Sequence, residues 1–114
     1  MNSNLRGKAG EAMAAEFLRA HGYTILDAGY RSAFGEIDLV AKKRRCVVFV
    51  EVKLRKNNYF SRACEAVTPA KQQRLRQTAL QWVVQYGEPQ ECRFDVIEIY
   101  TQTGEITHIE NAFS

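Results

Sequence analysis

The stretch VVFVEVKLR, residues 47 to 55, decides how this chain folds. Its valines and phenylalanine are typical of a buried β-strand. Side chains alternate between the two faces of a strand. One face therefore holds Val47, Phe49, Glu51, Lys53 and Arg55, and the other holds Val48, Val50, Val52 and Leu54. A strand that carries a carboxylate and an ammonium on one face is either a solvated strand end or part of a polar site at the edge of a core.

The length and composition of the chain indicate one globular domain over residues 1–114. A chain of 114 residues can bury one core and is too short for two. Its 46% hydrophobic and 25% charged residues exclude a disordered protein. The net charge of +3 favours an anionic partner only weakly. The local basic runs KKRR (42–45), KLRK (53–56) and KQQRLR (71–76) are more informative.

The three cysteines exclude two common classes of small protein. Cys46, Cys64 and Cys92 are odd in number and lack CxxC or Cys/His spacing, so neither a disulfide framework nor a zinc site is indicated. Free thiols fit a reducing cytoplasm. The first residues lack the apolar run of a signal peptide, and no stretch approaches the roughly 20 apolar residues of a membrane span. We therefore expect a cytoplasmic protein without a membrane partner.

Periodicity and turn signals predict seven elements in the order αβββαββ, which is a mixed-sheet α/β (α+β) domain. They are a helix over 4–21, strands over 23–30, 35–42 and 46–54, a helix over 69–86, and strands over 92–100 and 105–110. KRR (43–45) forms the turn of a hairpin, and residues 55–67 form a loop. Thr68 and Pro69 suit the start of the second helix. Its inward face is expected to hold Leu75, Ala79, Trp82, Val83 and Tyr86.

Two further acids, Asp38 and Glu11, lie at positions where the hydrophobic pattern alone does not explain a carboxylate. In the strand over 35–42, alternation puts Ile37, Leu39 and Ala41 on one face and Glu36, Asp38 and Val40 on the other. Across the hairpin, Asp38 can lie beside Glu51, although the sequence leaves the register open. Glu11 falls on the inward stripe of the first helix, near Ala14 and Leu18. A lone buried carboxylate is costly, so Glu11 should have a partner or a purpose.

Acids that converge near a lysine suggest a site for a divalent metal. Mg²⁺ and Mn²⁺ prefer carboxylate, carbonyl and water oxygens, which Asp38, Glu51 and the carbonyl of Val52 can supply. Such an ion lowers the pKa of a bound water, and Lys53 can orient or deprotonate that water or neutralise a phosphate. Each acid alone has a plainer interpretation. Glu51 could form a weak ion pair with Lys53 at a solvated strand end, and Asp38 could be an acid near a turn on a half-exposed strand. Glu11 could pair with a nearby lysine or arginine.

The combination of a helix acid, GEID and VEVK resembles the PD-(D/E)xK nuclease superfamily. Its restriction-endonuclease-like core has the order αβββαβ, which matches residues 4–100 and leaves one extra C-terminal strand. Nearly the whole chain is similar to the YraN-like family of small bacterial endonucleases, which resemble archaeal Holliday-junction resolvases. The segments that carry this resemblance are GKAGEAMAAEFLRAHGYTIL, GEIDLVA, VFVEVKLR, EAVTPAKQQRLRQTA and RFDVIEI.

The resemblance implies a metal-dependent endonuclease that cuts DNA, with branched DNA as the favoured substrate. It implies Asp38 and Glu51 as ligands of Mg²⁺ or Mn²⁺, Lys53 as the catalytic lysine, and Glu11 acting through a metal-bound water. Ile37 stands where the superfamily usually has proline. Two symmetric cuts in a junction imply a homodimer. The alternatives are a nucleic-acid-binding module without catalysis and a protein that binds another protein through residues 55–67.

Basic residues near this motif could form a nucleic-acid surface. Arg55, Lys71, Arg74 and Arg76 are the expected contacts, and the N-terminus of the second helix favours a phosphate. A solvated basic helix face explains the same pattern equally well. Residues 42–45 are interpreted as a solubilising turn in preference to a DNA contact. We expect Asp95 to have a structural hydrogen-bonding role, and His21 and His108 show no partner pattern.

Overall fold

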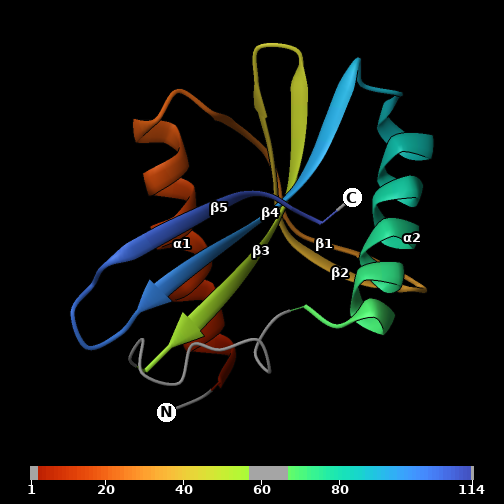
Figure 1. Ribbon diagram of the computed structural model, residues 1–114. Coiled ribbons are helices and arrows are strands. Elements are labelled where there is room, and N and C mark those ends of the chain that lie inside the picture. Colours follow the sequence, from red (N-terminus) through yellow and green to blue (C-terminus); the bar gives the residue numbers. More distant parts are fainter. Residues whose placement is uncertain (1–2, 57–66, 114) are drawn as a thin grey trace.

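The elements of the protein follow the predicted order. The computed structural model describes residues 3–56 and 67–113 (Figure 1). The helices are α1 (Ser3–Ala20) and α2 (Pro69–Tyr86). The strands are β1 (Thr24–Ser32), β2 (Gly35–Lys43), β3 (Cys46–Arg55), β4 (Glu91–Tyr100) and β5 (Ile106–Phe113). The predicted loop over 55–67 lies almost wholly outside the described residues. Neither described helix is long and apolar enough to cross a membrane.

The five strands form one mixed sheet in the order β1-β2-β3-β4-β5. β3 and β4 are parallel, and α2 makes the crossover between them, whereas the other neighbouring pairs are antiparallel. The predicted hairpin between β2 and β3 is confirmed, with Lys43 opposite Cys46 at its closed end. The predicted α+β class with a mixed sheet is therefore confirmed.

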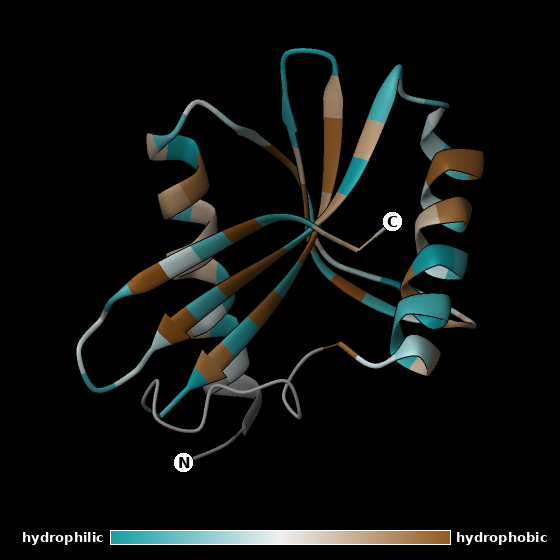
Figure 2. Cartoon of the chain, viewed as in Figure 1, coloured by the Kyte–Doolittle hydropathy of each residue, from teal (hydrophilic) through white to brown (hydrophobic). Residues whose placement is uncertain are grey.

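Each face of the sheet is covered by one helix (Figure 1). β3 lies in the middle and contributes to both cores, as the alternation in residues 47–55 predicts. Under α1, Val48 and Val50 pack with Leu18, and under α2, Val47 and Phe49 pack with Trp82. Figure 2 shows the apolar residues concentrated on the strands between the two helices. The central strand is thus buried on both sides, which fixes the backbone that carries Glu51 and Lys53.

The ends of α2 follow local sequence signals, with one exception. The Lys71 amide donates to the Thr68 hydroxyl at 3.2 Å, and Gly87 ends the helix with a φ of 109°. Of the expected inward face, Leu75, Ala79 and Trp82 are buried and Val83 packs beside them. The prediction that Tyr86 lies in the core is wrong, because 57% of this residue is exposed. It is the last residue of α2, and its ring lies beside those of Trp82 and Tyr30.

A buried charged network joins β4 to β5. Asp95 is fully buried, and Arg93 donates to both of its carboxylate oxygens at 2.8 Å. His108 bonds to Asp95 at 2.7 Å, and the Asn111 amide donates to it at 2.9 Å. Burial alone would raise the pKa of Asp95, but the bonds from His108 and Arg93 outweigh burial and lower that pKa. The structural role of Asp95 is confirmed, whereas the view that His108 lacks a partner is wrong.

Replacing Asp95 should test how much this network stabilises the fold. We expect Asp95→Asn to lower the free energy of unfolding at pH 7 by about 3–5 kcal/mol, because Arg93 would be left without its buried counterion. Since the pKa of Asp95 is lowered in the folded state, the stabilisation exists above the unfolded pKa and is lost as pH falls. Urea unfolding at pH 7 and in acid measures both effects.

The matched control is Glu110→Gln, which removes an exposed acid 3.9 Å from the same Arg93. It should change the free energy of unfolding by less than about 0.5 kcal/mol. Equal small effects of the two variants would contradict a stabilising role for the network.

Candidate active site

The site lies at a fork in the sheet, where β2 separates from β3. The β2–β3 pairing runs from Lys43 opposite Cys46 to Leu39 opposite Val50 and ends there. Beyond that point β2 stays paired only with β1, to Gly35. In Figure 1 the β1–β2 end and the β3–β4 end point in different directions. At the fork the Val52 amide donates instead to the carboxylate of Asp38, at 2.7 Å.

The fork breaks the alternation of side chains that the sequence predicted for β2. Leu39 packs in the core under α1, as expected. Ile37 packs with Val40 in the core under α2, so its predicted place beside Leu39 is wrong. Asp38 accordingly leaves the face of Val40 and lies close to Glu11 of α1. The physical reason is that regular alternation requires a regular ladder, and the β2–β3 ladder has ended at this point.

Three half-buried carboxylates meet at the fork. Glu11, Glu36 and Asp38, here called the acid group, each offer an oxygen within 4.8 Å of the others. Burial, followed by repulsion from Glu51, raises the pKa of Asp38 to about 7. Burial, followed by repulsion from Glu36, also raises the pKa of Glu11. The carboxylates thus crowd one another in a partly dehydrated place, so a cation would stabilise their charged forms.

A glycine of β1 lies beside the helix acid of this group. Gly29 has a φ of 69°, and a Cβ on it would lie 4.0 Å from the Glu11 carboxylate. Register places Gly29 opposite Asp38, between the pairs of β1 and β2 on either side. The positive φ accounts for a glycine at this position, because residues with a side chain rarely adopt that conformation.

Glu51 and two lysines form the other half of the site. The Glu51 carboxylate lies 2.9 Å from Lys71 Nζ and 3.5 Å from Lys53 Nζ. Burial, followed by the neighbouring Lys71, lowers the pKa of Lys53. Burial opposes the shift of Lys71, but hydrogen bonds to Lys53 and Glu51 raise the pKa of that residue. Lys53 is therefore the lysine that more readily gives up its proton.

The structure brings together the four predicted catalytic residues only in part. Glu11 and Asp38 belong to the acid group, and the charge of Glu51 acts on Asp38 from across the fork. Glu51 itself is not in the acid group and is held by Lys71 and Lys53. Sequence reasoning missed Glu36 as a site residue. The signal was present in GEID, because Glu36 lies two residues before Asp38 and was placed on its face.

The expected nucleic-acid contacts lie in different surroundings. Lys71 is bound to Glu51, and Arg74 is exposed beside Gly35. Arg76 is half-buried, donates to Gln72 and lies over the ring of Phe113.

Arg55 is the exception among these predicted contacts. It is 8% exposed and bonded to Glu98 at 3.0 Å. This pairing gives Arg55 a structural contact, and its role in nucleic-acid binding stays a prediction.

The residues at the fork fit a hard divalent cation. Three carboxylates supply the oxygen ligands that Mg²⁺ and Mn²⁺ prefer. Burial and repulsion by neighbouring acids raise the pKa of Asp38, and the attraction of a nearby cation would oppose both effects. Val52, whose carbonyl is a predicted ligand, is fixed at the fork through its amide. The donor set thus fits this class of ion, and the metal itself and the ligand roles of Asp38, Glu51 and Val52 stay predictions.

Comparison with known proteins assigns the chain to a family. Residues 10–99 match the model of the Uncharacterised protein family UPF0102. The chain belongs to the UPF0102 family. It is 40% identical to a UPF0102 protein of Caldicellulosiruptor saccharolyticus, over 99% of this chain and 100% of the relative. It is 49% identical to UPF0102 protein STH1475 of Symbiobacterium thermophilum, over 82% and 80% of the two chains. It is 42% identical to UPF0102 protein VP0448 of Vibrio parahaemolyticus, over 95% and 91%. The YraN-like resemblance is thereby confirmed.

In this UPF0102 member, the pKa of Asp38 predicts an unusual pH dependence of stability. Between pH 3.8, the ordinary pKa of an aspartate, and about pH 7, the folded protein holds a proton that the unfolded chain has lost, so stability falls as pH rises. Asp38→Asn mimics the protonated side chain. We expect the variant to gain on the order of 2–4 kcal/mol relative to wild type between pH 4 and pH 8. Urea unfolding in EDTA at both pH values measures this.

Glu16→Gln provides the control, since Glu16 is exposed on α1 and lies outside the acid group. Its stability should follow that of wild type at every pH. If Asp38→Asn also follows wild type, the carboxyl of Asp38 does not titrate near neutral pH.

Proposed function

We propose that this protein is a metal-dependent endonuclease that hydrolyses phosphodiester bonds in DNA, with branched DNA as its substrate. The observation that carries the proposal is the position of Asp38. Its carboxylate, with a pKa raised to about 7, lies between Glu11 and Glu36 on one side and the charge of Glu51 on the other. These are the acids of the implied nuclease motif, with Glu36 added. The αβββαββ order supports the proposal by analogy.

The chemistry divides between a cation and the residues of the chain. Asp38, Glu51 and the Val52 carbonyl would hold Mg²⁺ or Mn²⁺, with Glu36 close enough to join them. The bound ion supplies a water of lowered pKa and neutralises charge on the phosphate. Lys53 Nζ takes a proton from the attacking water in its neutral form, for which its lowered pKa suits it. Glu11 orients that water by accepting a hydrogen bond.

Lys71 holds Glu51 in place and presents positive charge at the same edge. Its Nζ lies 2.9 Å from the Glu51 carboxylate. A phosphate beside Glu51 would therefore be within reach of this ammonium, which stabilises the negative charge that develops on the phosphate oxygens. The exposed Arg74, one turn further along α2, extends the basic surface.

Cleavage assays test the proposal directly. Wild type should cut branched DNA in Mg²⁺ or Mn²⁺ and not in EDTA. Lys53→Ala should lower the rate by about 100-fold or more, because the water loses its proton acceptor. Glu51→Gln should lower it as well, because a charged ligand is lost. Junction, flapped and linear DNA compared side by side identify the substrate shape.

Lys56→Ala is the matched control, because Lys56 is an exposed lysine just beyond β3. It should cut DNA at the rate of wild type. If wild type and Lys53→Ala are equally active, the assigned residues do not carry the reaction. If wild type binds DNA without cutting it and Asp38→Asn binds equally well, the alternative of a non-catalytic binding module is favoured instead.

Metal binding has a readout that does not require activity. Mn²⁺ at about 100 times its dissociation constant should stabilise the folded protein by about 2.7 kcal/mol. The melting temperature should therefore rise with Mn²⁺ in wild type and in Glu16→Gln. It should stay constant in Asp38→Asn, which lacks the central ligand. An equal rise in all three proteins would place the ion elsewhere.

The proposal includes a homodimer, because two symmetric cuts in a junction need two active sites. The outer face of α2 offers an apolar surface for such an assembly, with Leu80 59% and Val84 74% exposed. Analytical ultracentrifugation at micromolar concentrations distinguishes a dimer from a monomer of 13.0 kDa.

A further inference from the structure

The turn between β2 and β3 carries cations that the candidate active site does not use. Lys42, Lys43, Arg44 and Arg45 are all exposed there. Among the residues that the structure describes, none of these four takes part in an ion pair. Figure 2 shows this turn as a hydrophilic tip beyond the apolar part of the sheet. Two hollows flank the turn, and Arg44 and Arg45 line both.

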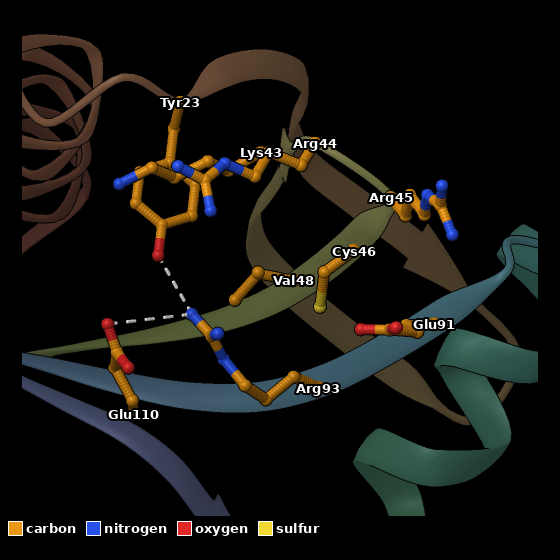
Figure 3. Close-up of a pocket in the computed structure, with 9 residues that line it drawn as sticks. All are labelled: Tyr23, Lys43, Arg44, Arg45, Cys46, Val48, Glu91, Arg93 and Glu110. Carbon is orange, nitrogen blue, oxygen red and sulfur yellow. Dashed lines mark hydrogen bonds and ion pairs between the residues drawn. The ribbon is translucent and has the colours of Figure 1, made fainter.

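The first hollow, of about 380 Å³, is shown in Figure 3. Arg93 at its floor donates to the Tyr23 hydroxyl at 2.8 Å and lies 3.9 Å from Glu110. The ammonium of Lys43 lies over the Tyr23 ring, 5.2 Å from its centroid. Glu91 adds a second acid to the wall. Arg93 is thus already bonded to other residues, and the carboxylates of Glu91 and Glu110 would repel a bound anion. This hollow is therefore poorly suited to an anion.

The second hollow lies between the β2–β3 turn and the end of α2 and is here called the Tyr86 hollow. It measures about 570 Å³, which is within the usual range for a ligand site. Its wall contains the three cations Lys42, Arg44 and Arg45 and one acid, Glu88. The remaining wall is formed by Leu26, Val47, Trp82, Tyr86, Gly87, Pro89 and Gln90. The excess positive charge favours an anionic occupant.

An aromatic side chain in this wall is both held in place and open to solvent. The Tyr86 ring lies 5.1 Å from the Trp82 ring and 6.4 Å from that of Tyr30. Tyr86 is nevertheless 57% exposed. Trp82 is 6% exposed, and its indole N–H is the one buried side-chain donor without an acceptor in the described part of the chain. The hollow therefore combines a stacking surface with cations that form no ion pair among the described residues.

We propose that the Tyr86 hollow binds a single-stranded segment of nucleic acid, with a base stacked on Tyr86 and a phosphate held by Lys42, Arg44 and Arg45. A positively charged groove with an exposed aromatic ring is the arrangement that binds unpaired strands without sequence preference. The C-terminal end of α2 carries negative partial charge, so the phosphate lies against the turn and not against the helix.

The Tyr86 hollow lies toward the opposite end of β2 from the acid group. Asp38 and Lys42, which lines the hollow, are four residues apart on β2 and so about 14 Å apart at about 3.4 Å per residue. The inference builds on the proposed action on DNA, because it gives an unpaired strand of a branched substrate a place on the protein. Binding can be measured in EDTA, where the proposed cleavage is off, so failure of either proposal can be recognised separately.

Fluorescence anisotropy of a labelled oligothymidylate in EDTA tests the stacking contact. Wild type and Tyr86→Phe should bind alike, because both retain the ring. Tyr86→Ser should bind on the order of 5- to 150-fold more weakly. Circular dichroism and thermal unfolding establish that each variant is folded. Binding of Tyr86→Ser equal to that of wild type would overturn the proposal.

A pair of single-charge variants tests the phosphate contact. Arg45→Gln should weaken binding and reduce the slope of log affinity against log salt by about 0.7. Arg19→Gln removes one exposed arginine from the last turn of α1 and should leave the slope unchanged. Equal slopes for the two variants would refute the assigned contact.

The affinity for unlabelled thymidine monophosphate, compared with that for the oligothymidylate, tests whether the occupant is a strand. A strand should bind much more tightly than a single nucleotide, because the phosphates on either side of the held one are also attracted by the positive charge of the turn. An oligothymidylate that binds no more tightly than the mononucleotide would overturn the assignment to a strand.

Discussion

One hydrogen bond, from the Val52 amide to the Asp38 carboxylate, makes the fork of the sheet possible. Where β2 leaves β3, the backbone amide of β3 loses its ladder partner, and a buried amide without an acceptor is strongly unfavourable. The Asp38 carboxylate accepts this amide at 2.7 Å. The bond holds the carboxylate in a partly dehydrated place near Glu51, and burial there raises its pKa. The break in the ladder thus creates the polar site.

The two cores on either side of β3 make that site rigid. Val48 and Val50 fix β3 against α1, while Val47 and Phe49 fix it against α2. Each helix then sends one side chain toward the fork. Glu11 comes from α1 and Lys71 from α2, and they meet groups of β2 and β3 that are already placed. Groups held in this way need little reorganisation when charge develops near them.

The sequence predicted those features that depend on neighbouring residues. The alternation in β3, the hairpin turn and the Thr68 cap were correct because each has a local physical signal. Other contacts, which the sequence did not predict, involve partners distant in the chain. The pairing of His108 with Asp95 needs β5 beside β4, and the pairing of Arg55 with Glu98 needs the parallel crossover. The hydrophobic periodicity within one helix or strand does not predict such contacts.

The same distinction applies to the site. Glu11, Asp38, Glu51 and Lys53 were proposed together from their motif, and the structure places them around one fork. The sequence placed Glu36 on the face of Asp38 but predicted neither its approach to Glu11 nor the shift of Ile37 to the α2 core. Both follow from the point at which the β2–β3 ladder ends, and the hydrophobic pattern does not mark that point.

Acidic and basic side chains gather on different sides of the fork. Glu11, Glu36 and Asp38 gather on one side, where Arg31 pairs with Glu36. Lys53 and Lys71 gather on the other side around Glu51. Neither half is neutral, and Asp38 between them has a pKa raised to about 7 by burial and acidic neighbours. A cation beside the acids and a phosphate beside the lysines would neutralise both halves at once. A fork that served only to hold two strands apart would have no need of this separation of charge.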